Sequence, residues 1–452
     1  MLDLEKSIEI HIKDKKIGIF GLGRTGACAY DLIKHFSNRL VIVNSGDPEK
    51  FKLAGPGQFL SDASDQAQSE LATCDYILLS PGIPREHAAL ALALKKNVLI
   101  INEIELGYKI LKDLNLKWVG IIGTNGKTTT TTLLGDIFNE QGKKTFVGGN
   151  IGVPLLEMVQ EIWQKKKNDY EIVLLELSSF QLESLFETRF DAGAILNIFP
   201  NHGERYNSVS DYAMAKWHLQ KLITKQGFFI WGNNHHFYDN EQKRGDISNQ
   251  IIDWRKDIWE NELRSNIDLK FFHLVGAHNL QNLFMAYELL KAITKFDQTV
   301  LEKTLDHFHG VHHRVEKVGG FSGVEFFNDA KSTNFEATLT AIKAMQGRSP
   351  LILILGGQKR GRGDSCLWVL PDLKKSVQEI YLIGETSDLL FPELKDQLPT
   401  FKTLDLERTL NEIKNKNFKG TVLFSPAFPS FDQFKNYAHR GDVFKELVKK
   451  IF

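Results

Sequence analysis

The chain has 452 residues, too many for one ordinary hydrophobic core, and typical domain sizes predict about three domains. Hydrophobic residues make up 42% and charged residues 25% of the chain, a composition that excludes a disordered or fibrous protein. Basic and acidic residues number 56 each, so the formal charge is zero, which excludes a surface built to wrap nucleic acid.

The N-terminal residues are charged and contain no apolar stretch of signal-peptide length, and no run of about 18 apolar residues follows them. The three cysteines, Cys28, Cys74 and Cys366, are scattered without metal-ligand spacing, as expected in a reducing compartment. We therefore expect a cytoplasmic protein that binds small-molecule substrates, with no nucleic acid and no insertion into a membrane. We also expect it to act as a monomer.

Short apolar runs alternate with longer helical patterns along the chain, a rhythm typical of parallel βαβ folds. The predicted strands are Lys16–Phe20, Leu40–Val43, Tyr76–Leu79, Val98–Ile101, Trp118–Ile122, Ile172–Leu175, Ala194–Asn197, Phe228–Trp231, Leu351–Leu355, Glu379–Ile383 and Thr421–Phe424. A helical pattern over Ala277–Ile293 and a polar connection precede the last group. We predict three α/β domains: a Rossmann-like domain over 1–107, a central P-loop-type ATPase domain with a parallel sheet over 108–309, and a Rossmann-like domain over 310–452.

The first glycine-rich turn reads GLGRTG over Gly21–Gly26, directly after a predicted strand. Its glycines permit a tight turn and the close approach of a diphosphate to a helix N-terminus. A dinucleotide site normally has a carboxylate at the end of the second strand, but this strand ends at Asn44 and Ser45, with Asp47 a few residues beyond. The turn therefore fits a UDP-sugar better than NAD. Glycines kept only for packing a helix on a strand remain an alternative.

The second turn reads GTNGKT over Gly123–Thr128 and joins a predicted strand to a predicted helix. In such a loop the backbone N–H groups cradle phosphate oxygens, Lys127 neutralises the terminal phosphates and the Thr128 hydroxyl can ligate Mg²⁺. The residues at 128–132 are all β-branched threonines, poor at starting a helix, so a requirement other than helix propensity selects them. Ile121 stands where the strict P-loop has its first glycine, which makes this a variant loop.

Further short motifs follow in order. They are GNIG at 149–152, ELSSFQL at 176–182, Asn197 with His202, Tyr212 with Lys216, GAHN at 276–279 with Asn282, His313 with Arg314, NDAKSTN at 328–334, and SPA at 425–427 leading to SFDQF at 430–434. Together with the GTNGKT loop, this ordered set resembles the Mur ligase family over nearly the whole chain. The resemblance implies an ATP- and Mg²⁺-dependent enzyme that forms an amide bond in peptidoglycan biosynthesis.

The resemblance also implies roles for single residues. The ATP site would comprise Gly123, Thr124, Asn125, Gly126, Lys127, Thr128, Thr129, Asn279, Asn282, Arg314 and Asp329. The UDP-substrate site would comprise Arg24, Thr25, Ser80, Pro81, Gly82, Asn150, Ser178 and Gln181. The catalytic residues would be Lys127, Glu176, His202 and Lys216, and the Mg²⁺ ligands would be Thr128, Glu176, His202 and Lys216, the lysine as its carbamate.

The third domain decides which amino acid is added. Its motifs at 329–334 and 425–434 most resemble those of the D-glutamate-adding member. This resemblance implies that D-glutamate is joined to UDP-N-acetylmuramoyl-L-alanine through an acyl phosphate. Lys331, Thr333, Arg360, Ser430 and Tyr437 would hold D-glutamate. Another amino-acid-adding Mur ligase is an alternative, although the Asp-Asn-Pro-Arg stretch typical of the diaminopimelate-adding member does not occur.

Two positions depart from the family pattern. The family reads Asp-His-Leu-Asp around the magnesium histidine, whereas this chain reads Asn-His-Gly-Glu at 201–204, which removes one carboxylate. A lysine of the glutamate site is expected where Arg360 stands beside Lys359, and either cation can bind a carboxylate. A catalytically silent binding protein and an NAD-dependent oxidoreductase are further alternatives. The four catalytic candidates argue against the first, and the second leaves the GTNGKT loop unexplained.

A group of histidines near the predicted start of the third domain admits two interpretations. His307, His309, His312 and His313 could form a transition-metal cluster, since imidazole is a common ligand. Gly310 interrupts the group, and no acid or cysteine shares its spacing. We therefore interpret these histidines as side chains at a domain junction, and give His235 and His236 the same interpretation.

Overall fold

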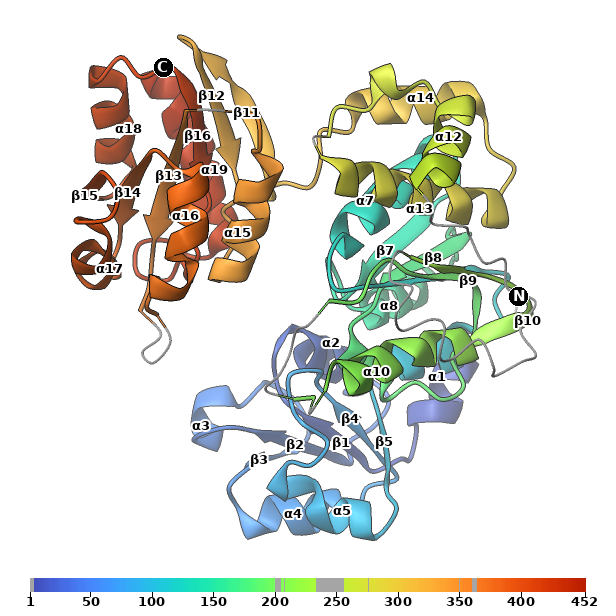
Figure 1. Ribbon diagram of the computed structural model, residues 1–452. Helices are drawn as coiled ribbons and strands as arrows, with labels where there is room; N and C mark the ends of the chain where they lie inside the picture. The colour runs from blue at the N-terminus through green and yellow to red at the C-terminus, as the bar shows by residue number, and fades with distance from the viewer. Residues whose placement is uncertain are drawn as a thin grey trace. The chain divides into compact units, whose positions relative to one another are not determined.

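The computed structural model describes residues 4–199, 205–206, 208–232, 256–274, 276–348, 350–359 and 364–452. The chain divides into two compact units, Met1–Phe271 with Ala277–Leu305, and Phe272–Gly276 with Asp306–Phe452. Within the described residues, the first unit contains two five-stranded sheets and the second contains one six-stranded sheet (Figure 1). The predicted α/β fold with three domains is confirmed.

The first sheet has the strand order β3-β2-β1-β4-β5, and all its pairings are parallel. Its strands are β1 (Ile17–Phe20), β2 (Leu40–Asn44), β3 (Gln58–Ser61), β4 (Tyr76–Leu79) and β5 (Leu99–Ile101). The accompanying helices are α1 (Leu4–Ile12), α2 (Arg24–Ile33), α3 (Pro48–Phe51), α4 (Asp65–Leu71), η1 (Ala88–Leu90), α5 (Ala91–Lys95) and α6 (Glu103–Leu111). Successive strand residues face opposite sides, so Ile19 packs with Tyr30 of α2 while Ile77 packs with Leu71 of α4.

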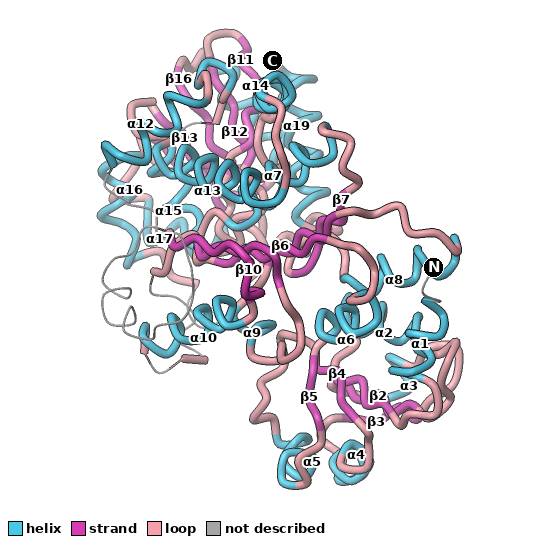
Figure 2. The backbone as a smooth tube through the Cα atoms, turned by 90° about the vertical axis from the view of Figure 1, so that its right-hand side faces the viewer, coloured by secondary structure: helices cyan, strands magenta, loops and turns pink. Residues whose placement is uncertain are grey.

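The second sheet has the order β10-β9-β6-β8-β7 and is also wholly parallel. Its strands are β6 (Lys117–Ile122), β7 (Thr145–Gly149), β8 (Ile172–Glu176), β9 (Phe190–Ile195) and β10 (Ile223–Trp231). The accompanying helices are α7 (Lys127–Glu140), α8 (Leu155–Lys165), α9 (Ser179–Leu182), α10 (Val209–Lys221), α12 (Lys256–Asn266), η2 (Leu269–Phe271), α13 (Ala277–Ile293) and α14 (Gln298–His307). Helices α7 and α13 cover one face of this sheet, and α10 lies on the other (Figure 2).

Buried polar side chains near the start of α6 form hydrogen bonds to the segment that follows β8 in the first unit. Glu105 is fully buried and accepts hydrogen bonds from the backbone N–H groups of residues 186–188 at 3.0, 2.7 and 3.2 Å, and from the Thr188 hydroxyl at 2.6 Å. Asn102 caps α6 and donates to the Gln181 carbonyl at 2.7 Å. One hydrophobic core runs from the α2 side of the first sheet into the second sheet. The two layers are therefore joined by apolar packing and by specific hydrogen bonds.

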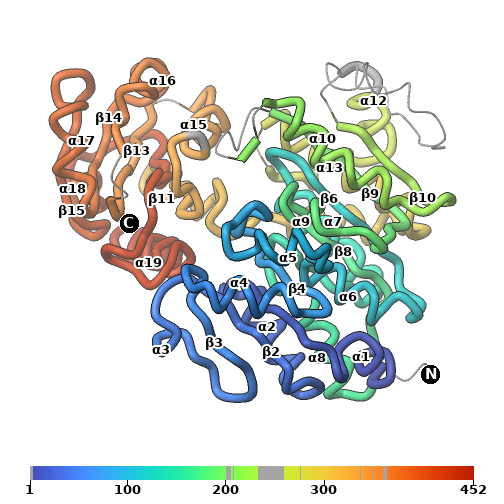
Figure 3. Tube along the Cα trace, turned by 90° about the horizontal axis from the view of Figure 1, so that it is seen from below, coloured from blue at the N-terminus to red at the C-terminus, as the bar shows by residue number. Residues whose placement is uncertain are grey.

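The third sheet has the order β11-β12-β16-β13-β14-β15, with β11 antiparallel to β12 and the other pairings parallel. Its strands are β11 (Glu316–Phe321), β12 (Val324–Asn328), β13 (Leu351–Gly356), β14 (Glu379–Ile383), β15 (Thr400–Leu404) and β16 (Gly420–Phe424). The accompanying helices are α15 (Phe335–Ala344), η3 (Leu367–Val369), α16 (Leu370–Ser376), α17 (Ser387–Leu394), α18 (Leu406–Asn415) and α19 (Tyr437–Ile451). Helices α15 and α16 cover one face, and α19 lies on the other (Figure 3).

Two predicted strands start several residues earlier in the structure than expected, and the domain boundaries stay predictions. The strand expected over Phe228–Trp231 runs over Ile223–Trp231. The strand expected over Ala194–Asn197 runs over Phe190–Ile195. Its start was not predicted because Asp191 interrupts the apolar pattern. The Asp191 side chain is partly exposed; its carboxylate accepts from the Trp118 N–H at 2.9 Å and forms an ion pair with Lys117. Boundaries at 107/108 and 309/310 are untested. No helix in the described part of the chain has the length and apolar character needed to span a membrane.

Candidate active site

The GTNGKT loop lies between β6 and α7, at the carboxyl end of the second sheet. Asn197, just after the neighbouring strand β9, holds this loop through both its backbone and its side chain. Its carbonyl accepts from the Thr124 N–H at 2.9 Å, and its side chain accepts from the Asn125 N–H at 2.8 Å and donates to the Asn125 carbonyl at 3.1 Å. The N-terminus of α7 follows, where backbone N–H groups have no partner within the helix. The arrangement is that of an anion-binding loop fixed from one side.

Gly126 is required by both backbone conformation and space. Its φ is +83°, in the left-handed region that residues with a Cβ seldom adopt. A Cβ added there would lie 2.2 Å from the Oδ1 atom of Asn282, on α13. Asn282 in turn donates to the Asn279 side chain at 3.2 Å. The structure therefore brings these two predicted ATP-site residues to the loop, although they follow it by about 150 positions in the sequence.

Two lysines lie under the loop. The Lys127 ammonium donates to the carbonyl groups of Gly123 and Thr124 at 2.9 and 3.0 Å. Lys216, on α10, is 2% exposed and donates to the Gly123 carbonyl at 3.3 Å, with its nitrogen 4.1 Å from the centre of the Tyr212 ring. Burial, and then the positive charge of Lys127, hold the pKa of the Lys216 amine well below its usual range. The Lys216 amine is therefore much easier to deprotonate than an ordinary lysine.

Glu176 is the last residue of β8 and is 2% exposed. Its Oε1 atom accepts from the Asn150 side chain at 2.8 Å, and its backbone carbonyl accepts from the Asn150 N–H at 2.8 Å. Its Oε2 atom is buried and has no hydrogen-bond partner among the described residues. A buried carboxylate oxygen without a donor is costly unless a cation or a ligand group meets it. The geometry therefore leaves one acceptor for a bound group.

Asn44, which stands where a dinucleotide site normally has a carboxylate, holds the first glycine turn. Asn44, the last residue of β2, accepts from the Leu22 N–H through its Oδ1 atom at 3.1 Å. Ser80 donates to the Gly21 carbonyl at 2.9 Å and so ties the turn to the end of β4. Asp47, the other candidate for a ribose, accepts from the Glu49 N–H as the cap of α3. Asn44 thus holds the glycine turn and Asp47 caps α3, so both side chains have local structural roles.

The other predicted UDP-substrate residues lie near the carboxyl ends of the two sheets of the first unit. Arg24 and Thr25 start α2, and the Arg24 side chain is 61% exposed and 3.7 Å from the Glu157 carboxylate of α8. Pro81 and Gly82 follow Ser80 after β4. Ser178 caps α9 in a capping box with Gln181, whose side chain accepts from the Ser178 N–H at 2.9 Å. Ser178 and Gln181 are thereby held rigidly at the end of β8.

Asp329 follows β12 in the second unit and is 3% exposed. Its oxygens accept from the Val315 N–H at 3.2 Å and from the Ser332 and Ser425 hydroxyls, both at 2.6 Å. Burial raises the pKa of this carboxyl to about 6, although these hydrogen bonds and the charge of Arg314 act in the opposite direction. Asp329 therefore joins its own loop to the segment that carries Arg314, the other nucleotide-site candidate of this unit.

The predicted D-glutamate residues lie on two loops of the same unit. Lys331 donates its backbone N–H to the His313 carbonyl at 3.0 Å, and Thr333 is half-buried just beyond it. Ser430 is 2% exposed, and its carbonyl accepts from the Phe434 N–H at 2.8 Å. Tyr437 is the first residue of α19 and is 40% exposed. Both loops lie at the carboxyl ends of neighbouring parallel strands, β12 and β16.

Arg440 holds those two loops together, a role that sequence reasoning did not find. Its guanidinium is fully buried and donates to the Ala330 carbonyl at 2.9 Å, to the Phe428 carbonyl at 2.9 Å and to the Pro429 carbonyl at 3.2 Å. Burial lowers its pKa to about 10, so it remains a cation at neutral pH. Its place in the polar pattern of α19 predicts a solvated side chain, so the sequence gives no local sign of this role.

Two predicted site residues, His202 and Arg360, lie outside the described residues. Their neighbours at 201, 203 and 361–363 do so as well, and so do His235 and His236. Lys359, the alternative to Arg360, is exposed, and its N–H donates to the Glu385 side chain at 3.2 Å. The roles given to His202 and Arg360 therefore stay predictions.

Known proteins similar to this chain extend over its whole length. A family model of the Mur ligase middle domain matches residues 121–290, which include the GTNGKT loop, Glu176 and Lys216. The UDP-N-acetylmuramoylalanine--D-glutamate ligase of Caldicellulosiruptor bescii is 32% identical over 475 residues, covering 97% of this chain and 98% of that protein. The protein of the same name from Fusobacterium nucleatum is 33% identical over 458 residues, covering 97% of this chain and 100% of the relative.

Solved structures share the fold at lower identity. The MurF ligase of Thermotoga maritima in complex with ADP has a TM-score of 0.56 at 15% identity and covers 100% of both chains. The UDP-N-acetylmuramate-alanine ligase MurC of the same organism has a TM-score of 0.55 at 16% identity, covering 96% of this chain and 99% of that one. Fold, loop geometry and full-length similarity agree. The chain therefore belongs to the Mur ligase family and, within it, to the group named UDP-N-acetylmuramoylalanine--D-glutamate ligase.

Proposed function

We propose that this chain joins D-glutamate to UDP-N-acetylmuramoyl-L-alanine at the expense of ATP, in the synthesis of peptidoglycan. The observation that carries the proposal is the similarity to D-glutamate ligases over 97% of the chain. As a member of the Mur ligase family the chain is an ATP-dependent ligase that forms amide bonds. The anion-binding loop at the start of α7 agrees with the use of ATP.

The reaction needs ATP because a carboxylate is a poor acylating agent. The muramoyl-alanine carboxylate takes the terminal phosphoryl group of ATP, giving an acyl phosphate and ADP. The amine of D-glutamate then attacks the carbonyl carbon, loses a proton, and displaces inorganic phosphate from a tetrahedral intermediate. Both steps gather negative charge on phosphoryl and carbonyl oxygens, so fixed cations and N–H donors around them lower the barrier.

Lys127 would stabilise this charge. Its ammonium donates to the carbonyls of Gly123 and Thr124, within the anion-binding loop itself. A terminal phosphate bound there offers stronger acceptors than these carbonyls, because the phosphate oxygens are charged. The N-terminus of α7 adds N–H groups aimed in the same direction. Lys127 would therefore bind the phosphoryl group throughout its transfer.

Mg²⁺ fits the residues that surround the loop, with one condition. The partnerless Oε2 atom of Glu176 and the Thr128 hydroxyl are oxygen ligands of the kind that this cation prefers. Among the described residues no three His, Cys, Asp or Glu side chains converge. Bound Mg²⁺ would neutralise phosphate charge during transfer. A Lys216 ammonium would repel the cation, so the condition is that Lys216 does not carry a positive charge when Mg²⁺ binds.

Conversion of Lys216 to a carbamate would meet that condition. A neutral amine attacks CO₂ and loses a proton, and the product carries a negative charge and two oxygens. The depressed pKa of the Lys216 amine favours the neutral form that this reaction needs. The modification would turn a buried cation into a ligand for Mg²⁺, together with Glu176 and His202. It would also replace the carboxylate that the Asn-His-Gly-Glu stretch lacks.

The second unit would bind D-glutamate and part of the nucleotide. Lys331 and Thr333 on one loop, with Ser430 and Tyr437 on the other, would hold the carboxylates, and Arg440 would keep the loops in register. Lys359 or Arg360 would add a cation. Arg314 and Asp329 would contact a nucleotide.

The substrate assignment is tested by phosphate release from ATP with UDP-N-acetylmuramoyl-L-alanine and one amino acid at a time. We expect release with D-glutamate and none above background with L-alanine, diaminopimelate or L-glutamate. Release with another amino acid alone would refute the D-glutamate assignment and keep the ligase class. No release with any amino acid would refute the proposed reaction.

Replacement of Lys127 tests the role of the loop. We expect Lys127→Ala to lower turnover about 10² to 10³-fold, by analogy with the loss of one donor to a developing oxyanion. Lys143→Ala is a matched control, since Lys143 follows the same helix and forms an exposed ion pair with Glu171. Equal turnover of the two variants, both folded, would contradict the proposed phosphate site.

The carbamate is tested with Lys216→Ala and with Lys221→Ala, an exposed lysine of the same helix, as control. Only the Lys216 variant should lose most activity, and acetate or formate should restore part of it by supplying carboxylate oxygens. With ¹³C-bicarbonate, the wild-type protein should show a carbamate carbon signal that Lys216→Ala lacks. A fully active Lys216 variant, or identical carbon spectra, would refute the carbamate.

A further inference from the structure

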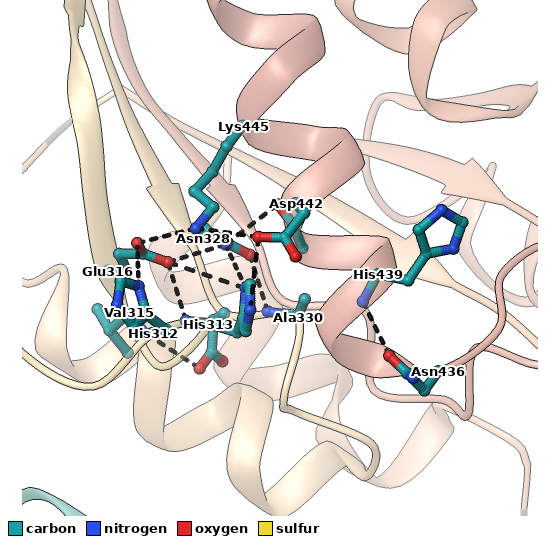
Figure 4. A network of polar contacts seen from close by, with 12 residues as sticks. His312, His313, Val315, Glu316, Asn328, Ala330, Asn436, His439, Asp442 and Lys445 are labelled. Carbon is teal, nitrogen blue, oxygen red and sulfur yellow. Dashed lines mark hydrogen bonds and ion pairs between the residues drawn. The ribbon is translucent and has the colours of Figure 1, made fainter.

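A buried polar network in the second unit connects the segment before β11, the end of β12 and helix α19 (Figure 4). Its centre is the pair His313 and Asn328, which are 7% and 0% exposed. Glu316 and Lys445, joined at 3.2 Å, lie beside the pair. Motif reasoning left the His313 imidazole and the Asn328 amide without a role.

The orientation of the Asn328 amide is fixed by its neighbours. Its oxygen accepts from the Ala330 N–H at 3.2 Å, while its nitrogen is 3.1 Å from a Glu316 carboxylate oxygen and 3.3 Å from the Gly441 carbonyl. The reverse orientation would place an NH₂ group against an N–H and an oxygen against two oxygens. The amide nitrogen therefore also points to the Nδ1 atom of His313, at 3.0 Å.

This geometry sets the state of the His313 ring. Because Asn328 donates to Nδ1, that nitrogen carries no proton, and a neutral ring has its proton on Nε2. Protonation of Nδ1 would set one donor against another. The ring packs closely against α19, since a Cβ on Gly441 would lie 2.1 Å from Nδ1. A neutral His313 is thus built into the packing of α19.

Charged groups around the ring act in both directions. Lys445 of α19 and the neighbouring His312 disfavour a positive ring, whereas Glu316 of β11 and Asp442 of α19 favour it. The Asp442 carboxylate is 3.8 Å from Nε2, and the Glu316 carboxylate is 3.9 Å from Nδ1. Burial is the largest influence, and it lowers the pKa of His313 below the ordinary histidine value. The lowered pKa of His313 agrees with the neutral ring that hydrogen bonding to Asn328 requires.

Candidate residues for both substrates of this unit are attached to the pair. The His313 carbonyl accepts from the Lys331 N–H at 3.0 Å, and the Tyr437 ring lies 6.3 Å from the imidazole, edge to face. Arg314 follows His313 directly. The backbone φ angles of His313 and Val315 are +63° and +48°, so the segment is held in a conformation that a β-branched residue seldom adopts. Such a conformation persists only where surrounding contacts fix it.

We propose that His313 and Asn328 form a positioning pair that holds the nucleotide-binding and amino-acid-binding residues of this unit in one arrangement. The inference rests on the proposed function, because Arg314, Lys331 and Tyr437 take their roles from it. The pair touches neither substrate. Protonation of His313 breaks the arrangement, so the affinity for D-glutamate falls as the pH falls through the pKa of this ring.

Two substitutions of His313 separate positioning from simple packing. Asn carries an oxygen close to the position of Nδ1, tolerates a left-handed backbone and does not titrate near neutral pH. Leu is similar in size and accepts no hydrogen bond. We expect His313→Leu to raise the KM for D-glutamate and for ATP about tenfold, the equivalent of one lost buried hydrogen bond, and to leave the KM for the UDP substrate unchanged. We expect His313→Asn to keep wild-type values at neutral pH and to lose the rise of the D-glutamate KM at low pH.

Equal KM values in the two variants, an equal rise of all three KM values, or a low-pH rise that persists in His313→Asn would overturn the proposal. The tautomer is measured without substrates, by ¹⁵N resonances of histidine-labelled full-length protein, with His313→Asn identifying the signal. A proton on Nε2 alone at pH 7 is expected. A proton on Nδ1 would refute the pair. The wild-type reaction with D-glutamate tests the proposed function separately, because it involves neither variant.

Discussion

Replacement of Gly126 by alanine tests whether the loop geometry described here governs ATP binding. The change costs about 1–2 kcal/mol because an L-residue is placed at φ +83°. It costs about 1–3 kcal/mol more because the new Cβ would lie 2.2 Å from the Asn282 side chain, which is 5% exposed and has little room to retreat. Part of the total falls on ATP binding, since Asn282 and the loop must separate. At 1.4 kcal/mol for each factor of ten, we expect the KM for ATP to rise about 10- to 100-fold.

Gly142 provides the matched control at the other end of the same helix. Its φ is +76°, but no atom lies within 4 Å of an added Cβ. Gly142→Ala should therefore lower the unfolding temperature through the backbone cost alone and leave the KM for ATP unchanged. The assay is ATP-dependent phosphate release at varied ATP, with thermal unfolding of each variant. A KM for ATP of Gly126→Ala within twofold of the Gly142 control would refute the reasoning.

Three further predictions concern buried polar groups. Glu105→Gln should lower the unfolding free energy of the first unit by about 1–3 kcal/mol in denaturant titrations, because one carboxylate oxygen is replaced by an NH₂ group that faces an N–H donor. Unchanged stability would show that the hydrogen bonds of Glu105 to residues 186–188 are dispensable. Arg440→Lys should destabilise the second unit by about 3 kcal/mol and raise the KM for D-glutamate, since a single ammonium nitrogen cannot take both positions that the two terminal guanidinium nitrogens occupy; a change in neither quantity would contradict its role. The folded pKa of Asp329, about 6, lies above its ordinary value, so the folded chain binds the extra proton and gains stability as the pH falls from about 6 to 4. Asp329→Asn should lack that gain in denaturant titrations over this range, and an identical pH dependence would refute the assignment.

Most inner strands could be predicted because burial on both faces leaves a continuous apolar run, whereas the inner strand β12 was missed because Glu325 and Asn328 interrupt its run. Tyr76–Leu79 coincides with β4, and the helix Ala277–Ile293 coincides with α13. The strands that were missed have a reason in their surroundings. Gln58–Ser61, Glu316–Phe321 and Thr400–Leu404 lie at sheet edges, where one side is open and polar residues are tolerated, and Thr145–Gly149, also at an edge, contains two glycines.

The candidate site was predicted as a set of motifs, but not as a set of contacts. The loop and Glu176 follow strands, so their place at the carboxyl end of a parallel sheet follows from the chain order. The contacts of Asn44, Glu105 and Arg440 depend on segments far away in sequence, and a polar side chain in a polar stretch gives no sign that it is buried. Local patterns carry periodicity, whereas these contacts depend on tertiary packing.

A carbamate on Lys216, as proposed above, would make the activity of the enzyme depend on dissolved CO₂. A carbamate on a neutral amine forms and decays reversibly, so its occupancy follows the CO₂ content of the surroundings and the pH. Because the amine is 2% exposed, exchange must wait for the packing around α10 to open. Protein kept in degassed buffer would then lose competence slowly and recover it slowly when bicarbonate returns. Its specific activity would depend on the CO₂ content of the buffer in which it was last stored.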